Sequence, residues 1–319
     1  MINDCAFVGE TLLKYLPPDV EKKHITHSRG ILSKTFGLAY KILGAKGDVY
    51  HAHYLLQDCY IAARLGKKPL VGHAHGSDLR QEMRNRKWRW IVKYNLLKSD
   101  KIFVAQPTIL EIAKEFNETA EYLPIPFDPE IFFPKPLPEN ENEKIVLLAS
   151  AHNFKIKGTD KFLRALASLP NRVKIKSLAL GNDFLKAQQL SRDLNLNIEF
   201  IEGVPHNNMN ELYWGSNLIL GSYGIGQLDT VAIEAMACGR PVVHSVSKKF
   251  FQTCPLEELE NSDKATEIIS RLLTDRREIE GRIKKQLLYV NSMHSAPLVA
   301  KRLMNVYSEL QKDTGREVA

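Results

Sequence analysis

The stretch DTVAIEAMACGRPVV, residues 229–243, has the pattern of a short helix that leads into a buried strand. Val231 and Ala235 are four residues apart, so they lie on one face of a helix. Gly239 is the residue type that most often ends a helix, and the segment from Pro241 onward has the apolar, β-branched character of a buried strand. A loop, a short helix and a strand in this order form the repeating unit of an open α/β sheet.

Glu234 is the one carboxylate inside this apolar helix. Such a carboxylate is either a solvated surface residue or a residue that binds a ligand, and the stretch alone leaves both open. The preceding loop is rich in glycine, which exposes backbone N–H groups to an anion, although its spacing fits neither Walker A nor G-x-G-x-x-G. Because a carboxylate repels phosphate, Glu234 is better suited to accept hydrogen bonds from the hydroxyls of a ribose.

The 319 residues exceed what one hydrophobic core usually organises, so two domains are expected. The composition, 44% hydrophobic and 25% charged, is typical of a soluble globular protein. No apolar run approaches the roughly 20 residues that span a bilayer, and the N-terminus lacks the features of a signal peptide. We therefore expect a cytoplasmic protein.

The scattered cysteines include no C-x-x-C pair, so reduced thiols are favoured over a metal or redox site.

Short apolar runs alternate with helical stretches on both sides of a proline-rich segment. Before it the runs are DVYHAH (48–53), PLVGHAHG (69–76) and KIFVAQ (101–106). After it they are KIVLLAS (144–150), VKIKSLALG (173–181), IEFIEG (198–203), NLILGSYG (217–224) and PVVHSV (241–246). The alternation predicts two Rossmann-like, doubly wound parallel-sheet domains that face a cleft.

The predicted domain organisation has four parts. We expect an N-terminal domain over residues 1–126, a proline-rich linker over 127–143, a C-terminal domain over 144–294, and a C-terminal helix over 295–319 that packs back on the N-terminal domain. The net charge of +7 favours an anionic partner, which charge alone leaves open among a phosphorylated small molecule, a membrane surface and nucleic acid.

Three strand ends carry residues that could take part in binding or catalysis. Lys157 and Gly158 precede a predicted helix, where a phosphate would meet a positive charge and free N–H groups. The pair His51 and His53, and a second H-x-H pair that ends in His75, raise a metal hypothesis. A structural interpretation of His51 and His53 is favoured, because the sequence offers no further cluster of ligands in the strand–helix rhythm.

Six segments share their order and spacing with a known family. They are DVYHAH, HGSD, LPIPFDPEIFFP, LLASAHNFKIKGTDKFLRAL, IEFIEGVPHNNMNELY and AIEAMACGRPVV. The chain resembles the retaining GT-B glycosyltransferases of glycosyltransferase family 4 over most of residues 48–246. The resemblance implies a nucleotide-sugar donor held by the C-terminal domain and a glycan or lipid-linked acceptor held by the N-terminal domain. It also implies catalysis without a metal or other cofactor, and the chain has no D-x-D motif.

The resemblance assigns roles by motif. It implies that Glu234 binds the donor ribose, that Lys157 contacts the diphosphate, that Val204 lies beside the base and that His75 lies near the transferred sugar. Ser77 and Asp78, in the same HGSD motif, would position the sugar or the acceptor.

The chain departs from the family pattern at several positions. Gly226 stands where the family has a first glutamate, His152 stands where it has a phosphate-binding arginine, and Asp229 stands where a glycine is usual. By their positions in the motifs, the resemblance still assigns all three residues to the donor site. Asp229 could replace the missing glutamate or cap the helix. The usual first strand and glycine-rich loop are missing or much reduced.

Residues 80–98, RQEMRNRKWRWIVKYNLLK, combine basic and aromatic side chains. They predict either a peripheral contact with an anionic membrane or an ordinary amphipathic helix.

No nucleic-acid-binding module is found, so nucleic acid is not an expected partner. A nucleotide-sugar epimerase, a metal hydrolase and a catalytically weak scaffold remain alternatives, and both UDP and GDP donors stay open.

Overall fold

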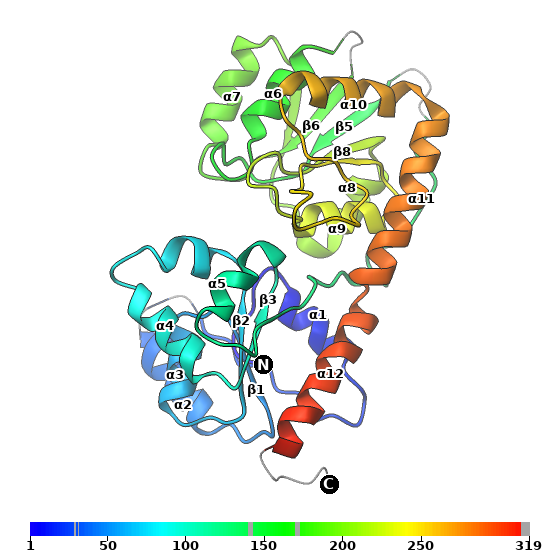
Figure 1. The fold of residues 1–319 in the computed structure, drawn as a ribbon. Helices are drawn as coiled ribbons and strands as arrows, with labels where there is room; N and C mark the ends of the chain where they lie inside the picture. The colour runs from blue at the N-terminus through cyan, green and yellow to red at the C-terminus, as the bar shows by residue number, and fades with distance from the viewer. Residues whose placement is uncertain (29, 31, 140–142, 170–172, 314–319) are drawn as a thin grey trace. The chain divides into compact units, whose positions relative to one another are not determined.

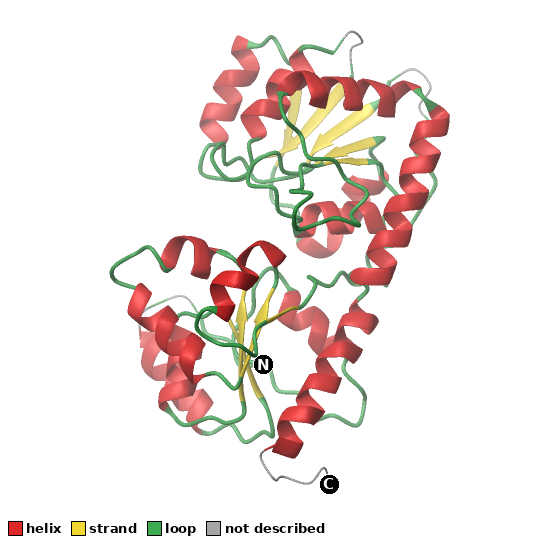
Figure 2. Cartoon of the chain, viewed as in Figure 1, coloured by secondary structure: helices red, strands yellow, loops and turns green. Residues whose placement is uncertain are grey.

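The computed structural model describes residues 1–28, 30, 32–139, 143–169 and 173–313. The chain divides into two compact units. Unit 1 comprises Met1–Pro126 and Ser295–Ala319, and unit 2 comprises Phe127–His294. Each unit contains a parallel sheet with helices packed along it (Figure 1, Figure 2). The predicted α/β class with two parallel-sheet domains is confirmed.

The strands described in unit 1 are β1 (Tyr50–His53), β2 (Leu70–Ala74), β3 (Lys101–Val104) and β4 (Glu121–Tyr122). They are parallel and lie in the order β1-β2-β3-β4. Ile2 adds isolated parallel bridges to Ile25 and Ala52 beside β1. Among the described residues, Ile2 therefore extends the sheet beyond β1 by isolated bridges.

Helices cover both faces of this sheet. One face carries α2 (Leu38–Leu43), α3 (Gln57–Arg64), α4 (Arg89–Lys98) and α5 (Leu110–Lys114), and the other carries α1 (Val8–Tyr15) and α12 (Ala296–Asp313). Short helical turns lie at η1 (Ser33–Gly37), η2 (Asp78–Glu82) and η3 (Pro107–Ile109). Alternation along β3 explains the two cores, because Ile102 and Val104 join the first and Phe103 joins the second.

The C-terminal helix belongs to unit 1. Val299 and Leu303 of α12 pack in one buried cluster with Val8 and Leu12 of α1. The predicted helix extends to residue 319, but residues 314–319 lie outside the described part of the chain.

The strands described in unit 2 are β5 (Ile145–Leu148), β6 (Lys174–Leu178), β7 (Ile198–Ile201), β8 (Leu218–Leu220) and β9 (Val242–Val243). The helices are α6 (Thr159–Ala167), α7 (Phe184–Asp193), α8 (Met209–Trp214), α9 (Thr230–Ala237), α10 (Ser262–Thr274) and α11 (Arg276–Met293), with a turn at η4 (His206–Asn208). No helix in the described residues is long and apolar enough to cross a membrane.

The strand order of unit 2 positions its functional loops. The parallel strands lie in the order β7-β6-β5-β8-β9, so the chain moves outward from β5 in one direction and then returns to add β8 on the other side. The loops after β5 and β8 are neighbours at this switch point, which is where open α/β sheets bind ligands. Between β8 and β9, the helix, the glycine at φ 70° and the strand follow the pattern predicted for residues 229–243.

The predicted linker is part of unit 2 over the residues described. Phe127 and Phe132 are buried within that unit. The fully buried Arg240 donates hydrogen bonds to the carbonyl oxygens of Lys135 and Pro136. Burial lowers the pKa of Arg240 to about 10, so its guanidinium remains charged at neutral pH. Residues 140–142 of the predicted linker lie outside the described part of the chain.

Arg240→Ala is expected to lower the free energy of unfolding by about 3 kcal/mol, because several buried carbonyl groups lose a charged donor. Urea unfolding followed by circular dichroism measures the change. Arg276→Ala is the control, since the Arg276 side chain is 91% exposed and its pair with Glu280 is worth less than about 0.5 kcal/mol. Equal losses in the two variants would contradict the role given to Arg240.

Candidate functional site

Lys157 and Asp229 meet at the switch point of unit 2. Lys157 lies in the loop between β5 and α6, and Asp229 lies in the loop between β8 and α9. The Lys157 Nζ lies 2.5 Å from Asp229 Oδ2. The two side chains are 28% and 17% exposed, so the pair is accessible from solvent. The structure thus brings together two of the residues that the sequence assigned to the donor.

Backbone contacts hold the two loops against each other. The Tyr223 N–H donates to the Lys157 carbonyl at 2.6 Å, and Gly158 takes the left-handed conformation (φ 61°) that turns the chain into α6. A Cβ on Gly224 would lie 1.7 Å from the carbonyl oxygen of Ile156. The close approach of the loops therefore requires glycine at position 224.

Asp229 also caps α9. Its Oδ1 accepts a hydrogen bond from the Ala232 N–H at 3.2 Å. Burial alone would raise the pKa of Asp229, but the charge of Lys157 and the hydrogen bonds from Lys157 and Ala232 outweigh it, and the pKa lies below its usual value. Asp229 is therefore ionised at neutral pH and neutralises Lys157.

His244 orders the loop after β8 without adding charge. Its Nδ1 accepts from the Ser222 N–H at 2.8 Å, and its Nε2 donates to the Gln227 carbonyl at 2.6 Å. Burial lowers the pKa of His244, so the ring is neutral. The 3.8 Å separation between His244 Nδ1 and Asp229 Oδ1 is consequently a contact with a neutral ring, not an ion pair.

Glu234 lies on α9 with its carboxylate inside the unit. The residue is 3% exposed. Oε1 lies 2.6 Å from His206 Nε2, and Oε2 accepts from the Tyr213 hydroxyl at 3.3 Å. Burial raises the pKa of Glu234, while His206 and Tyr213 oppose that rise. Because each carboxylate oxygen has two lone pairs, Glu234 keeps capacity to accept hydrogen bonds from a ligand.

His206 and Tyr213 are site residues that the sequence reasoning missed. His206 belongs to the same EGVPH loop as the half-buried Val204, which was predicted to lie beside the base. Phe132 packs near both rings, at centroid distances of 5.4 Å to His206 and 6.2 Å to Tyr213. The available signal was the buried carboxylate itself, which requires hydrogen-bond donors.

The surroundings of His152 and Gly226 do not fit their predicted roles in binding the donor. The ring of His152 is fully buried, with Nε2 3.0 Å from Ser177 Oγ, and burial lowers its pKa. A neutral, buried ring does not replace a phosphate-binding arginine, so we remove His152 from the phosphate contacts. Gly226 has φ 66°, and a Cβ there would lie 3.1 Å from the Ser247 nitrogen. The loop conformation therefore favours glycine over glutamate at this position.

In unit 1, His75 follows β2 and is half-buried. Its Nε2 lies 3.0 Å from His53 Nδ1, and its ring stacks on His73 at 4.4 Å between centroids. Burial lowers the pKa of His75 to about 3, so its ring is neutral and suited to hydrogen bonding. Ser77 is half-buried at the start of η2.

Asp78 differs from its predicted role in positioning the sugar or acceptor. It is fully buried, and its carboxylate accepts hydrogen bonds from the N–H groups of Leu55, His75, Gly76 and Leu79. Burial raises its pKa, while these backbone hydrogen bonds oppose the rise. We assign Asp78 to anchoring the loop after β2, since its oxygens are directed to the backbone.

Three comparisons with known proteins bear on this site. Residues 130–285 match the family model described as "Glycosyl transferases group 1". N-acetyl-alpha-D-glucosaminyl L-malate synthase of Bacillus anthracis is 24% identical over 215 residues, which are 61% of this chain and 56% of that protein. The chain thus spans little more than half the length of this curated relative.

Solved structures share the fold. Sucrose-phosphate synthase from Thermosynechococcus elongatus has a TM-score of 0.72 and 20% identity, with 93% of this chain and 87% of that chain covered. Anabaena HepE in complex with UDP and glucose has a TM-score of 0.74 and 16% identity, with 90% and 86% covered. The same protein with UDP-glucose gives a TM-score of 0.74 and 16% identity, with 90% and 85% covered.

Residues 130–285 thus resemble the group 1 glycosyltransferases, and the chain shares the GT-B fold of the solved structures. The matched segment contains Lys157, Asp229 and Glu234 together with the newly found His206 and Tyr213. The group 1 segment therefore coincides with unit 2, in which these residues converge.

Gly224→Ala is expected to lower the free energy of unfolding by about 3 kcal/mol, because the added methyl group forces the two loops apart. Urea unfolding measures the loss. Gly281→Ala is the matched control: nothing lies within 4 Å of a Cβ at that position of α11, so a gain of about 1 kcal/mol is expected. Similar effects of the two substitutions would show that the loops are not packed as described.

Proposed function

We propose that this protein is a retaining glycosyltransferase of family 4, which moves a hexose from a UDP- or GDP-sugar to a glycan or lipid-linked acceptor without a metal. The observation that carries the proposal is the convergence of Lys157, Asp229 and the N-terminus of α9 at the switch point of unit 2, with Glu234 buried on the same helix. A cation, a helix N-terminus and a buried carboxylate suit a diphosphate linked to a ribose.

Lys157 is the proposed diphosphate ligand. In the protein alone its charge is neutralised by Asp229 at 2.5 Å. A diphosphate carries more negative charge than one carboxylate, so it competes for the ammonium group and draws Lys157 toward itself. As the sugar departs, negative charge grows on the diphosphate, and Lys157 with the N–H groups of α9 stabilises that charge.

Glu234 is the proposed ribose ligand. His206 and Tyr213 fix the orientation of its carboxylate before the ligand arrives, so little conformational freedom is lost on binding. Its remaining lone pairs accept hydrogen bonds from the two vicinal hydroxyls of a ribose. Val204 and the loop around it lie beside the base. His206 thereby acts as a positioning residue for Glu234.

Asp229 and two residues of unit 1 are assigned to the sugar and the acceptor. Gly226 offers no carboxylate for the sugar hydroxyls, so Asp229 takes that role once Lys157 turns to the diphosphate. In unit 1, His75 and Ser77 are proposed to position the sugar or the acceptor, since a neutral histidine donates and accepts hydrogen bonds. The UDP and UDP-glucose complexes of HepE favour UDP as the first nucleotide to test.

Calorimetric titration with UDP, GDP and ADP tests the donor site. Wild-type protein is expected to bind one of the three selectively, and Glu234→Ala is expected to weaken that binding about ten-fold or more, since the ribose loses its acceptor. Lys157→Ala should weaken it to a similar degree and should also lower sugar transfer.

Two matched controls accompany this titration. Glu280→Ala and Lys186→Ala remove the same groups from exposed positions of unit 2, and both should bind as the wild type does. If the wild type binds none of the nucleotides, the proposed function fails. Binding without transfer to any acceptor would leave a nucleotide-binding scaffold in its place.

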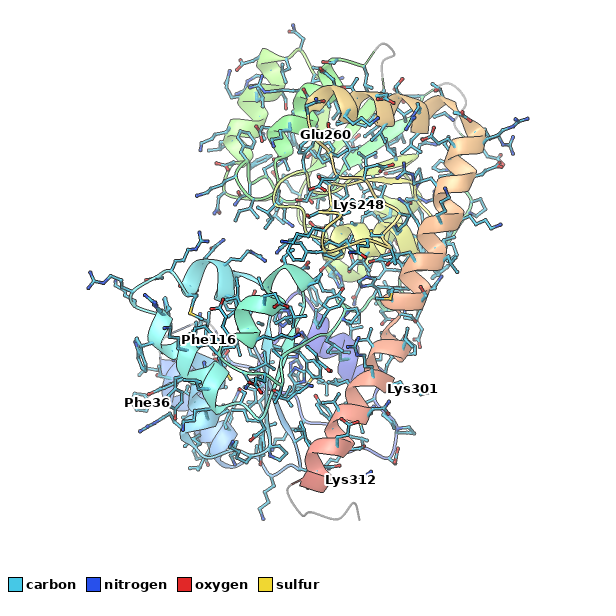
Figure 3. All side chains as sticks on the ribbon, in the orientation of Figure 1. Phe36, Phe116, Lys248, Glu260, Lys301 and Lys312 are labelled. Carbon is cyan, nitrogen blue, oxygen red and sulfur yellow. The ribbon has the colours of Figure 1, made fainter. Side chains whose placement is uncertain are left out.

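A membrane-bound acceptor is favoured by one face of unit 1. Helices α2 and α4 both pack against α3, on the same side of the sheet. Phe36 and Tyr40 are 77% and 81% exposed, and Figure 3 shows Phe36 at the outer side of the unit. Trp90 is 54% exposed, and neither residues 32–47 nor residues 83–98 contain an acidic side chain.

This face combines what an interfacial contact needs. Exposed aromatic and aliphatic groups enter the headgroup region, and nearby lysines and arginines attract anionic lipid. The predicted contact through residues 80–98 is therefore extended to residues 32–47, and we propose that the two segments bind an anionic membrane together.

Phe36→Ser combined with Tyr40→Ser is expected to reduce binding to anionic phosphatidylglycerol vesicles about ten-fold, because two interfacial side chains are lost. Co-sedimentation at low and high salt measures binding, which should fall as salt rises. Leu185→Ser, at an exposed position in unit 2, is the control. Wild-type protein that stays in the supernatant at low salt would refute the membrane contact.

A further inference from the structure

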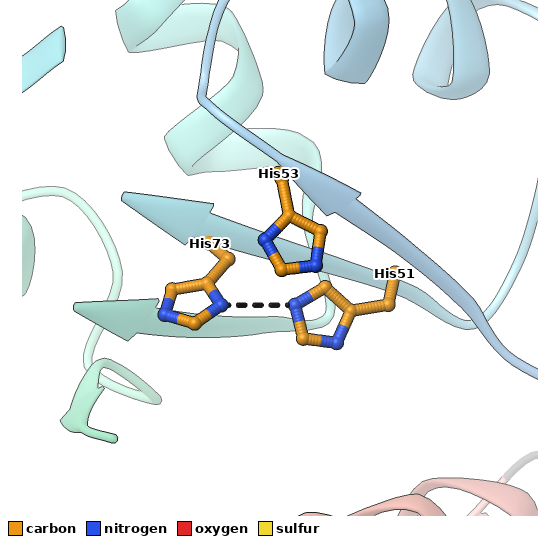
Figure 4. A group of neighbouring side chains, drawn as sticks. All are labelled: His51, His53 and His73. Carbon is orange, nitrogen blue, oxygen red and sulfur yellow. Dashed lines mark hydrogen bonds between the residues drawn. The ribbon is translucent and has the colours of Figure 1, made fainter. Parts of the chain in front are cut away.

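Three histidines of unit 1 are gathered on one face of its sheet. His51 and His53 alternate along β1, and His73 of β2 is the register partner of His53. The ring centroids of His51 and His53 are 4.8 Å apart, and each is 5.2 Å from that of His73 (Figure 4). All three side chains are almost completely buried.

Their nitrogens are spaced for a shared ion. One ring nitrogen from each histidine lies within 4.8 Å of the other two, and His51 Nε2 lies 3.2 Å from His73 Nδ1. At the usual zinc–nitrogen distance of about 2.0–2.1 Å, the ligands of a tetrahedral ion lie roughly 3.4 Å apart. The His51–His73 pair already has this spacing, and a nitrogen of His53 lies within 4.8 Å of both.

Neighbouring groups orient two of the rings. The Tyr307 hydroxyl lies 2.5 Å from His51 Nδ1, which leaves Nε2 of that ring directed to His73. His75 Nε2 lies 3.0 Å from His53 Nδ1. Histidines that bind metals are commonly held by such a hydrogen bond at the second ring nitrogen.

Hydrogen bonding among these groups leaves the cluster incomplete. His53 Nε2 and His73 Nε2 are buried, and neither has a hydrogen-bond partner among the described residues. Buried ring nitrogens are normally paired, so His53, whose Nδ1 already faces His75, has capacity for a further partner at Nε2. A Cβ on Gly9 would lie 3.0 Å from His53 Nε2, so the glycine leaves space beside this nitrogen.

A carboxylate lies beside the cluster. The Asp4 Oδ1 would lie 3.2 Å from a Cβ on Gly9, which borders the space next to His53 Nε2. That oxygen accepts hydrogen bonds from the N–H groups of Cys5 and Gly9, so the three imidazoles remain the proposed ligands.

We propose that His51, His53 and His73 bind one late first-row transition-metal ion, with Zn²⁺ as the probe. Three imidazoles without a thiolate or carboxylate ligand are typical of zinc and its neighbours rather than of Mg²⁺ or Ca²⁺. The ion ties β1 to β2 and, through Tyr307, to α12. This site is separate from the donor site of unit 2 and does not depend on the proposed glycosyl transfer.

The proposal departs from the sequence-based expectation that the histidines are structural and that no metal is needed. That expectation rested on the lack of a further ligand cluster in the strand–helix rhythm. The β1–β2 register makes such a cluster unnecessary, because it places His73 of the second H-x-H pair opposite His53, a pairing that the motifs do not reveal.

The test uses the full, untagged chain. Because the site is buried, the metal must enter as the chain folds, so the protein is unfolded with a chelator and refolded with Zn²⁺, with Mg²⁺ or without metal. After exhaustive dialysis, elemental analysis is expected to find about one zinc ion per chain and no retained magnesium. Refolding with Co²⁺ should give the visible absorption of a tetrahedral nitrogen site.

His53→Gln combined with His73→Gln should abolish zinc retention, whereas His24→Gln, at an exposed histidine of unit 1, should retain it. If the double variant fails to fold, X-ray absorption of the zinc-loaded wild type decides by counting imidazole ligands, and three support the site. The proposal is overturned if wild-type protein retains no zinc after refolding, or if the double variant retains as much as the wild type.

Discussion

The adjacency of β5 and β8 is the constraint on which unit 2 depends. These strands are separated in sequence by two other strands and their helices, yet they pair directly, so the loops at their ends lie side by side. The hydrogen bond from Tyr223 to the Lys157 carbonyl and the absence of a side chain at Gly224 then lock the loops together. Lys157 and Asp229 are close together because the pairing of β5 with β8 fixes the backbone of both loops.

The sequence predicts the parts of this arrangement that repeat locally. Apolar runs and helical spacing place the strands, and the pattern around Gly239 defines the end of α9 and the start of β9. The position of Lys157 before a helix and of Glu234 inside one follows from the same periodicity. These features depend on neighbours within a few residues, and such neighbours are visible in a single chain.

Partners distant in sequence are not visible in this way. Asp229 is 72 residues from Lys157, and His206 is 28 residues from Glu234. The sequence does not show which side chains are buried, for the same reason. His152 and Asp78 both follow strands and carry groups that could bind a ligand. In the structure, however, the His152 ring packs inside unit 2, and the Asp78 carboxylate accepts hydrogen bonds from backbone N–H groups. Side-chain type suggests chemistry, and only the direction of the side chain decides between a ligand and an anchor.

The placement of α12 has a consequence for how the protein is made. Unit 1 is discontinuous in sequence, since its last helix is separated from Pro126 by the whole of unit 2. During synthesis on the ribosome, all of unit 2 is made before Val299 and Leu303 of α12. Until α12 is made, Val8, Leu12 and Phe103 lack the helix that buries them. The second core of unit 1 is therefore completed only after unit 2 has been synthesised, and until then its apolar face is open to aggregation.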